Sequence, residues 1–135
     1  MRRVPLLLAC RLTFLFSAGA FAQWGPGWNI PAGVEKEKSP VTPTADVLKR
    51  GKAIFGRSCQ KCHGPEGKGD GPDADPRNPA ADLTDEFLAD LNPDGVMFYR
   101  IWNGRPPIMP AFKSQLTRNE VWTVVEYAKS LQKEQ

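Results

Sequence analysis

The chain has 135 residues, with 18 lysines and arginines against 15 aspartates and glutamates. This length fits one small domain. Arg2, Arg3 and Arg11 lie in an N-terminal segment that we expect to be removed, and without them 15 basic residues stand against 15 acidic ones. A chain with no net charge lacks the basic footprint of a nucleic-acid-binding protein, so we exclude nucleic acid as a partner.

Residues 1–22 have the pattern of a cleaved secretory signal peptide. Two arginines precede an apolar stretch, and Ala20-Phe21-Ala22 is a small-x-small cleavage signature. The uninterrupted apolar part, 12–22, is 11 residues long, whereas a membrane-spanning helix needs about 20. We therefore predict a cleaved export signal, with membrane association only through a partner complex.

Cys10 lies inside this segment. It follows Leu7-Leu8-Ala9, which resembles a lipoprotein processing site. The apolar run before it is very short and Arg11 follows at once. We interpret Cys10 as a residue lost with the signal, not as a lipid anchor.

The next segment, 23–43, is rich in proline and glycine. Four prolines forbid a continuous helix, so we predict an extended arm. Flexible linkers rarely carry large aromatic residues, yet this arm holds Trp24 and Trp28. We therefore expect the arm to be docked, with Trp28 packed on the domain that follows.

Residues 44–135 form the predicted domain, which begins with a helix over 45–58. Thr44 is placed to cap this helix. Small and apolar residues recur on one of its faces at helical spacing, namely Val47, Gly51, Ile54, Phe55 and Ser58. Gly51 in mid-helix costs about 1 kcal/mol relative to alanine, and close approach of a second helix would account for that cost.

Two helices are predicted after the loop 64–81. A short one begins near Thr84. A longer one has Asn92 as its cap, Pro93 at its first position and Gly104 after its end.

The last predicted helix begins with a capping box of Thr117 and Glu120. Its buried stripe repeats at helical spacing and consists of Val121, Val124, Val125, Ala128 and Leu131. No repeat and no strand pattern is present. The predicted architecture is a small all-α domain of about four helices with long loops.

The motif Cys59-Gln60-Lys61-Cys62-His63 is the strongest chemical signal in the chain. The spacing C-x-x-C-H is that of a haem c attachment site, where two thiols meet the vinyl groups of one porphyrin edge and the imidazole meets the iron. A zinc site would need a further ligand, and residues 23–135 hold no other cysteine or histidine. A redox CxxC would accompany a βαβ pattern, which is absent. We predict one haem c, attached through Cys59 and Cys62, with His63 on the iron.

The second iron ligand must be another residue type, since His63 is the only histidine. Met97 lies within a predicted helix, where methionine is more often core packing. Met109 lies in the proline-rich loop 104–112, whose stiff backbone can present a thioether to a fixed point. We predict Met109 as the ligand and keep Met97 as the alternative.

These features together resemble the class I, single-haem cytochromes c. The resemblance covers residues 45–131 and rests on the first helix, the attachment motif, the Met109-Pro110-Ala111-Phe112 loop and the final helix. The segment 64–72 is similar to a bacterial, periplasmic branch of the family. The doubled proline at 106–107 departs from the family pattern.

The resemblance implies that the first and last helices cross closely. Gly51 and Phe55 would then meet Val124 and Tyr127. This agrees with the cost of a glycine in mid-helix.

The resemblance also implies that a backbone carbonyl near a proline accepts a hydrogen bond from the ring of His63. Pro76 and Pro79 are both candidates. Three further residues have two open roles: contact with the haem or its propionates, or packing within the helix. They are Tyr99, Trp102 and Arg105.

We predict electron transfer and no enzymatic activity. With His63 and Met109 on both axial positions, iron cycles between Fe(III) and Fe(II) without binding substrate. One rival is a dedicated haem subunit of a larger dehydrogenase or oxidase complex, docked through the arm. The other is a haem enzyme such as a peroxidase, which needs an open iron site that Met109 would close.

Charges are distributed unevenly along the sequence. Basic residues around the attachment motif are a candidate docking surface for redox protein partners, namely Lys49, Arg50, Lys52, Arg57, Lys61 and Lys68. An acidic stretch follows, with Asp82, Asp85, Glu86, Asp90 and Asp94. Solvated helix faces are the alternative interpretation of both groups.

Overall fold

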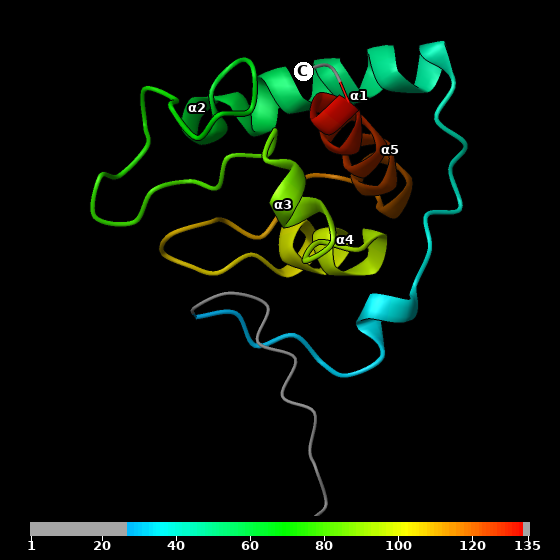
Figure 1. Ribbon diagram of the computed structural model, residues 1–135, viewed down its shortest axis with the longest axis horizontal. Helices are drawn as coiled ribbons and strands as arrows, with labels where there is room; N and C mark the ends of the chain where they lie inside the picture. The colour runs from blue at the N-terminus through cyan, green and yellow to red at the C-terminus, as the bar shows by residue number, and fades with distance from the viewer. Residues whose placement is uncertain (1–26, 134–135) are drawn as a thin grey trace, which may run out of the picture.

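The computed structural model describes residues 27–133 (Figure 1). Its helices are α1 (Ala45–Ser58), α2 (Gln60–His63), α3 (Glu86–Ala89), α4 (Asp94–Asn103) and α5 (Arg118–Ser130), with 3-10 turns η1 (Val34–Lys36) and η2 (Leu131–Lys133). Regular strands are absent from this range, and the predicted all-α class is confirmed. The predicted signal peptide, 1–22, and Trp24 lie outside the described residues.

The crossing of α1 and α5 forms the centre of the core (Figure 1). The rings of Phe55 and Tyr127 meet edge to face, with centroids 5.4 Å apart. A Cβ added to Gly51 would lie 2.5 Å from Cβ of Tyr127 and 2.7 Å from the carbonyl oxygen of Thr123. The close crossing is therefore confirmed, although Thr123 and not Val124 is the second residue against Gly51.

Both long helices bury the faces that their spacing predicts. On α1 the buried residues are Val47, Gly51, Ile54 and Phe55, while Ser58 is half-buried. On α5 burial is continuous from Val121 to Ala128. The stripe on α5 is thus wider than predicted, because this helix is covered by α1 on one side and by α4 on another.

The predicted caps of α1 and α5 are confirmed. The hydroxyl of Thr44 accepts a hydrogen bond from the amide of Val47 at 3.3 Å. At α5 the hydroxyl of Thr117 accepts from the amide of Glu120 at 3.2 Å, and the Glu120 carboxylate accepts from the amide of Thr117 at 2.9 Å.

The predicted starts of α3 and α4 are wrong by one or two residues. The helix α3 begins at Glu86 and not at Thr84, and Asp85 caps it by accepting from the amide of Phe87 at 2.9 Å. Pro93 is the residue before α4, because the side-chain amide of Asn92 donates back to the carbonyl oxygen of Leu88 at 2.7 Å. Asn92 therefore closes the turn after α3 and does not cap α4.

The arm is docked along α4, as expected. The amide of Gly95 donates to the carbonyl oxygen of Glu37 at 3.2 Å, and the amide of Ser39 donates to Asp94 at 3.0 Å. The expectation of a wholly extended arm is wrong at η1. There Gly33, with φ of 95°, permits a tight turn in which the amide of Lys36 donates to its carbonyl oxygen at 3.0 Å.

Over residues 27–133, no helix combines the length and the apolar character that crossing a bilayer requires.

Candidate functional site

The attachment motif lies where α1 meets α2. Cys59 is the C-terminal cap of α1 and the N-terminal cap of α2, and Cys62 and His63 are the last two residues of α2. Both thiols are free and half-buried, and Cys59 packs against the hydrophobic core. This junction gathers two thiols and one imidazole within little more than one helical turn.

A loop caps the carbonyl end of α2. The amides of Asp73, Gly71 and Gly69 donate to the carbonyl oxygens of Lys61, Cys62 and His63 at 2.8, 3.1 and 2.8 Å. These carbonyls would otherwise lack partners at the helix end. A Cβ on Gly71 would overlap the backbone of Lys61, so glycine permits this approach. Sequence reasoning found the glycines but not this role, because the pairing depends on the path of the loop.

The ring of His63 is held by Ala81. Nδ1 of His63 lies 3.1 Å from the carbonyl oxygen of Ala81, so Nδ1 is the donor and Nε2 keeps its lone pair. Neither Pro76 nor Pro79 supplies the acceptor, which corrects the expectation from the sequence. No local signal marks Ala81.

The chain folds back to bring Ala81 to this place. The amide of Leu83 donates to the carbonyl oxygen of Gly67 at 2.7 Å, which closes the loop over the end of α2. His63 and Ala81 are 18 positions apart, so their contact depends on this loop closure. No local sequence motif predicts it.

Burial shifts the pKa values of two groups in the attachment motif. It lowers the pKa of His63, and the bond to Ala81 opposes this only in part. The neutral imidazole is the form that binds a metal. Burial also raises the pKa of Cys59 to about 12, with Cys62 acting in the same direction and Arg57 against it. Cys59 therefore holds a neutral sulfur at pH 7, as a thioether also would.

Met109 lies in a closed loop between α4 and α5. The amide of Arg105 donates to the carbonyl oxygen of Met109 at 2.7 Å, and the reverse bond measures 3.1 Å. Gly104 has φ of 62°, and a Cβ there would lie 2.5 Å from the backbone nitrogen of Ala111. Met109 is half-buried and packs against the same core as Cys59.

Met97 occupies a different environment. It is 8% exposed, lies inside α4 and belongs to the core cluster itself. This is the packing role that the sequence favoured for Met97.

The remaining predicted contacts divide between two places. Trp102 stacks on Phe98 with ring centroids 5.7 Å apart, and Tyr99 and Trp102 border a small cleft between α4 and the arm. Trp102 therefore packs within α4, and its contact with the haem stays a prediction. Arg105 contacts the arm through Trp28.

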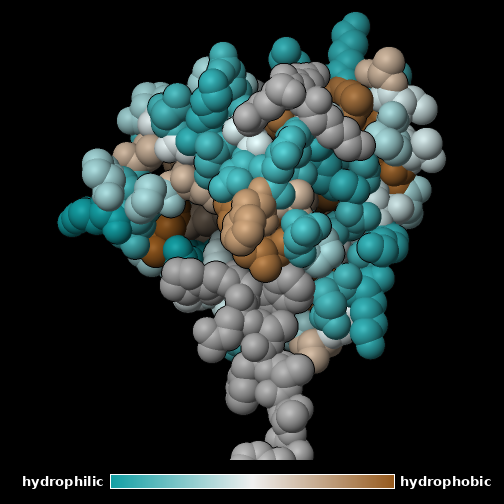
Figure 2. Space-filling view, viewed as in Figure 1, coloured by the Kyte–Doolittle hydropathy of each residue, from teal (hydrophilic) through white to brown (hydrophobic). Residues whose placement is uncertain are grey.

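The residues present fit a haem c. Half-buried apolar side chains border the core around the motif and the Met109 loop, among them Cys59, Ile101 and Met109. Figure 2 shows a hollow with hydrophobic atoms on the left of this face, where Figure 1 draws the loop after α2 above the loop before α5. Two thiols and an imidazole with a free ring nitrogen are the donor set that this group requires.

Comparison with known proteins decides the family. Residues 46–127 match the family described as cytochrome C oxidase, cbb3-type, subunit III. The chain is a class I c-type cytochrome of this family. The cytochrome carries one haem c and is an electron-transfer domain. The match runs from the start of α1 to near the end of α5 and includes the attachment motif.

Two relatives are similar in sequence. The quinohemoprotein alcohol dehydrogenase ADH IIB of Pseudomonas putida is 29% identical over 116 residues, which are 86% of this chain and 16% of that protein. The cbb3-type cytochrome c oxidase subunit FixP of Bradyrhizobium sp. (strain ORS 278) is 31% identical over 81 residues, which are 60% of this chain and 26% of that protein. The cytochrome therefore spans about a sixth of the first relative's length and about a quarter of the second's.

A solved structure is similar in fold. It is a chain of the reducing HAO-like protein complex of Kuenenia stuttgartiensis, 33% identical with a TM-score of 0.57. The alignment covers 68% of the cytochrome and 46% of that chain.

Proposed function

We propose that Cys59 and Cys62 hold the haem through thioether bonds and that His63 and Met109 are its iron ligands. The observation that carries this proposal is the hydrogen bond at 3.1 Å between Nδ1 of His63 and Ala81, which leaves Nε2 as the ring nitrogen for a metal. Such a partner fixes the tautomer and orientation of a ligating imidazole.

The cytochrome passes single electrons between redox partners and binds no substrate at its iron. When bound, the haem supplies the Fe(III)/Fe(II) couple. The chain holds His63 on a capped helix end and Met109 on a closed loop, so both ligands stay in place whichever oxidation state is present. A thioether ligand and an apolar surrounding both favour the reduced state. With Met109 as the second iron ligand, no open iron site would remain for a peroxide, so this assignment argues against peroxidase chemistry.

The test compares two methionines. The oxidised protein should show the weak far-red sulfur-to-iron charge-transfer band of histidine–methionine ligation. Met109→Ala should abolish this band and lower the reduction potential, since the soft ligand is lost. Met97→Ala is the matched control and should keep the band, although it costs stability. The reverse result would assign the ligand to Met97.

Residues 1–22 are proposed as the signal that directs the cytochrome to the periplasm, with cleavage before Gln23. Support comes from the charge and apolar pattern of the segment. N-terminal sequencing of the protein from a periplasmic extract tests this, and a chain that retains Met1 would contradict it.

We propose that redox partners dock near Lys61. Three of the six predicted basic residues are engaged in ion pairs, Arg50 with Asp46 at 3.1 Å, Arg57 with Glu120 at 3.0 Å and Lys68 with Glu66 at 2.7 Å.

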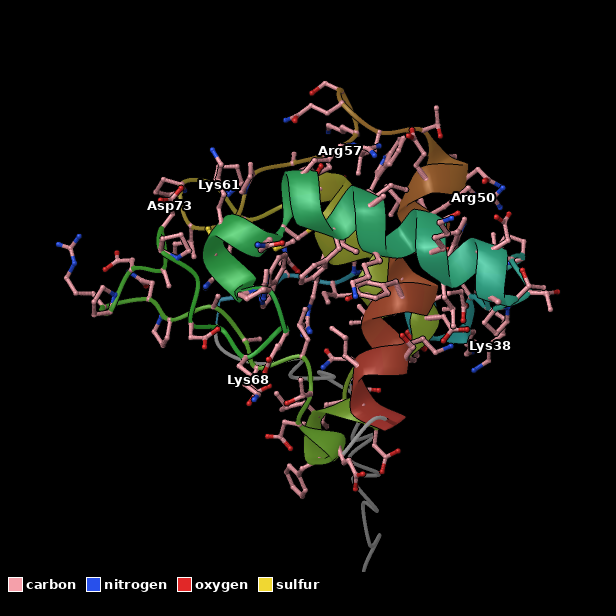
Figure 3. The ribbon with its side chains drawn as sticks, turned by 90° about the horizontal axis from the view of Figure 1, so that it is seen from above. Lys38, Arg50, Arg57, Lys61, Lys68 and Asp73 are labelled. Carbon is pink, nitrogen blue, oxygen red and sulfur yellow. The ribbon has the colours of Figure 1, made fainter. Side chains whose placement is uncertain are left out.

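Figure 3 places Lys61 beside the attachment motif and Arg50 near the opposite end of α1. The basic residues therefore do not form one compact patch, and Lys61 is the one that lies inside the attachment motif. Lys61→Glu should slow electron exchange with an anionic partner and weaken its dependence on salt. An unchanged rate at low salt would contradict docking at this place.

A second candidate function is that of a fixed haem subunit in a larger oxidoreductase. The relatives favour it, because the similar region is a small part of a longer dehydrogenase or oxidase chain. Native gels of gently solubilised membranes, stained for haem, test it. A haem band at high mass supports the fixed subunit, and a band at the mass of the isolated cytochrome supports the free carrier.

A further inference from the structure

The arm contacts the loop that carries Met109, although about 80 positions separate them in sequence. The ring of Trp28 lies near two guanidinium groups, with its centroid 5.2 Å from Cζ of Arg100 and 5.5 Å from Cζ of Arg105. Both distances are within the reach of cation–π attraction, about 6 Å. Arg105 immediately precedes the two prolines at 106–107 in the Met109 loop. Trp28 therefore contacts this loop directly.

The backbone of the arm also contacts Arg105. Gly27 has φ of 82°, and a Cβ there would overlap the guanidinium of Arg105. A larger residue would therefore be excluded both by its backbone conformation and by lack of space. Gly27 and Trp28 together enclose the side chain of Arg105.

Arg105 in turn fixes the backbone of Met109. The two residues exchange both backbone hydrogen bonds, at 2.7 and 3.1 Å. A Cβ on Gly104 would lie 2.6 Å from the carbonyl oxygen of Met109, so this end of the loop is tightly closed. A contact that holds Arg105 in place therefore also restrains Met109, through the two backbone hydrogen bonds between these residues.

The arm is anchored at its other end as well. Glu37 and Ser39 bond to the first turn of α4 through Gly95 and Asp94. Figure 1 shows the arm passing beneath α4 and ending beneath the loop before α5. Over its described residues the arm is attached both at Glu37 and Ser39 and at Gly27 and Trp28, so it is a strap across α4 that contacts Arg105.

The two arginines repel one another. Burial lowers the pKa of Arg100 to about 10, and the charge of Arg105 acts in the same direction. The negative face of an aromatic ring offsets such repulsion. Without Trp28, Arg105 would gain by moving away from Arg100, and its loop would move with it.

We propose that Trp28 is a positioning residue for the sixth iron ligand: by holding Arg105, it keeps the Met109 loop closed. This rests on the proposed function, in which Met109 binds the iron. Opening of the loop is needed before an added ligand can replace Met109. The strap therefore sets how easily the sixth position is taken.

The experiment measures imidazole binding to the oxidised holoprotein, together with loss of the far-red band. Trp28→Ala should bind imidazole about 5- to 30-fold more tightly, the effect of losing two cation–π contacts. Trp28→Phe keeps an aromatic face and should restore most of the wild-type affinity. Val34→Ala, in η1 of the same arm, is the matched control and should stay within about twofold of wild type.

A double mutant tests the route through Arg105. In an Arg105→Gln background, Trp28→Ala should change imidazole affinity by less than about twofold, because the contact is already lost. Gly27→Ala serves if Trp28→Ala yields too little holoprotein. It displaces Arg105 without removing the ring, and it should tighten imidazole binding in the same direction.

Two results have different meanings. If Trp28→Ala and Gly27→Ala both match wild type while Met109→Ala loses the far-red band, the strap is wrong and the proposed ligand stands. If Met109→Ala keeps the far-red band, the proposed ligand itself is wrong. Equal effects of Trp28→Ala and Val34→Ala would reduce Trp28 to general stabilisation of the arm, and would also overturn the proposal.

Discussion

The crossing of α1 and α5 and the loop that carries Met109 are held in different ways. At the crossing, buried apolar side chains and one glycine bring two helices together inside the core. The loop is held by backbone hydrogen bonds and by the ring of Trp28. Its support comes from a half-buried segment at the other end of the chain.

This difference implies that the crossing sets the stability of the domain, whereas the strap sets how readily Met109 is exchanged for another ligand. Close-packed interiors tolerate little change of volume, so damage at the crossing should lower the stability of the whole domain. A half-buried strap can loosen while the core stays intact. Variants at the crossing should therefore change unfolding more than ligand exchange, and variants at the strap should do the opposite.

The largest expected effect is at Gly51. An added methyl would lie 2.5 Å from Cβ of Tyr127 and must push α1 and α5 apart. Overpacking of this kind costs about 1–3 kcal/mol, more than the gain of about 1 kcal/mol in helix propensity. Gly51→Ala should therefore lower the free energy of unfolding, and Gly51→Val should lower it further.

Gly56 is the matched control on the same helix. A Cβ there meets only the end of the Gln60 side chain, at 3.6 Å. Gly56→Ala should raise stability by up to about 1 kcal/mol. Denaturant unfolding of the holoproteins measures both variants, and a Gly51→Ala protein as stable as Gly56→Ala would show that the crossing is wrongly placed.

Asp94 joins α5 to the arm and should give a smaller effect than Gly51→Val. Its carboxylate accepts from Lys129 of α5 at 2.7 Å and from Ser39 of the arm at 3.0 Å. Asp94→Asn should cost about 1–3 kcal/mol, as expected for hydrogen bonds to a charged, half-buried group. Asp46 also lies in the first turn of its helix, α1, but is exposed, so Asp46→Asn should change stability little.

The effect of Asp94 should depend on pH. Burial acts to raise its pKa, but the bonds from Lys129 and Ser39 lower it below the ordinary value of 3.8. Its contribution is therefore complete above that value and disappears as the pH falls through the lower folded pKa. Unfolding curves of wild type and Asp94→Asn should converge in acid, and a constant difference down to pH of about 2 would contradict this.

The smallest predicted changes are at the N-terminal caps of α5 and α1. Thr117→Ala removes the hydroxyl that accepts from the amide of Glu120. The loss of a cap typically costs about 0.5–2 kcal/mol. Thr44→Ala removes a single cap bond from α1 and should cost less, because Thr117 forms a reciprocal box and Thr44 does not. Thermal unfolding of the two variants gives the order, and a larger loss at Thr44 would contradict it.

Local signals predicted the helical scaffold well. The range of α1, the capping box of α5 and the close approach at Gly51 all follow from spacing, capping chemistry and the cost of a mid-helix glycine. The start of α4 was misplaced, because the side chain of Asn92 bonds to the preceding turn. The partner of Asn92 lies in α3, so the residues around the start of α4 do not predict it.

The surroundings of the site were harder to predict. The sequence identified the thiols and the imidazole through one short motif, whereas Ala81 and Gly71 act through their backbones, which carry no residue signature. Trp28 was expected to pack on the domain, but its partners, Arg100 and Arg105, are set by where the arm crosses α4. Contacts across such sequence distances follow from the fold and not from any local pattern.

The central claim is that the cytochrome binds one haem covalently through Cys59 and Cys62. Acid–acetone extraction followed by intact-mass measurement of the purified protein tests it most directly. The wild-type chain, beginning near Gln23, should keep its colour with the protein and carry the mass of one added haem. The Cys59→Ala, Cys62→Ala double variant should lose its haem to the solvent. Release of free haem from the wild-type chain would contradict the claim.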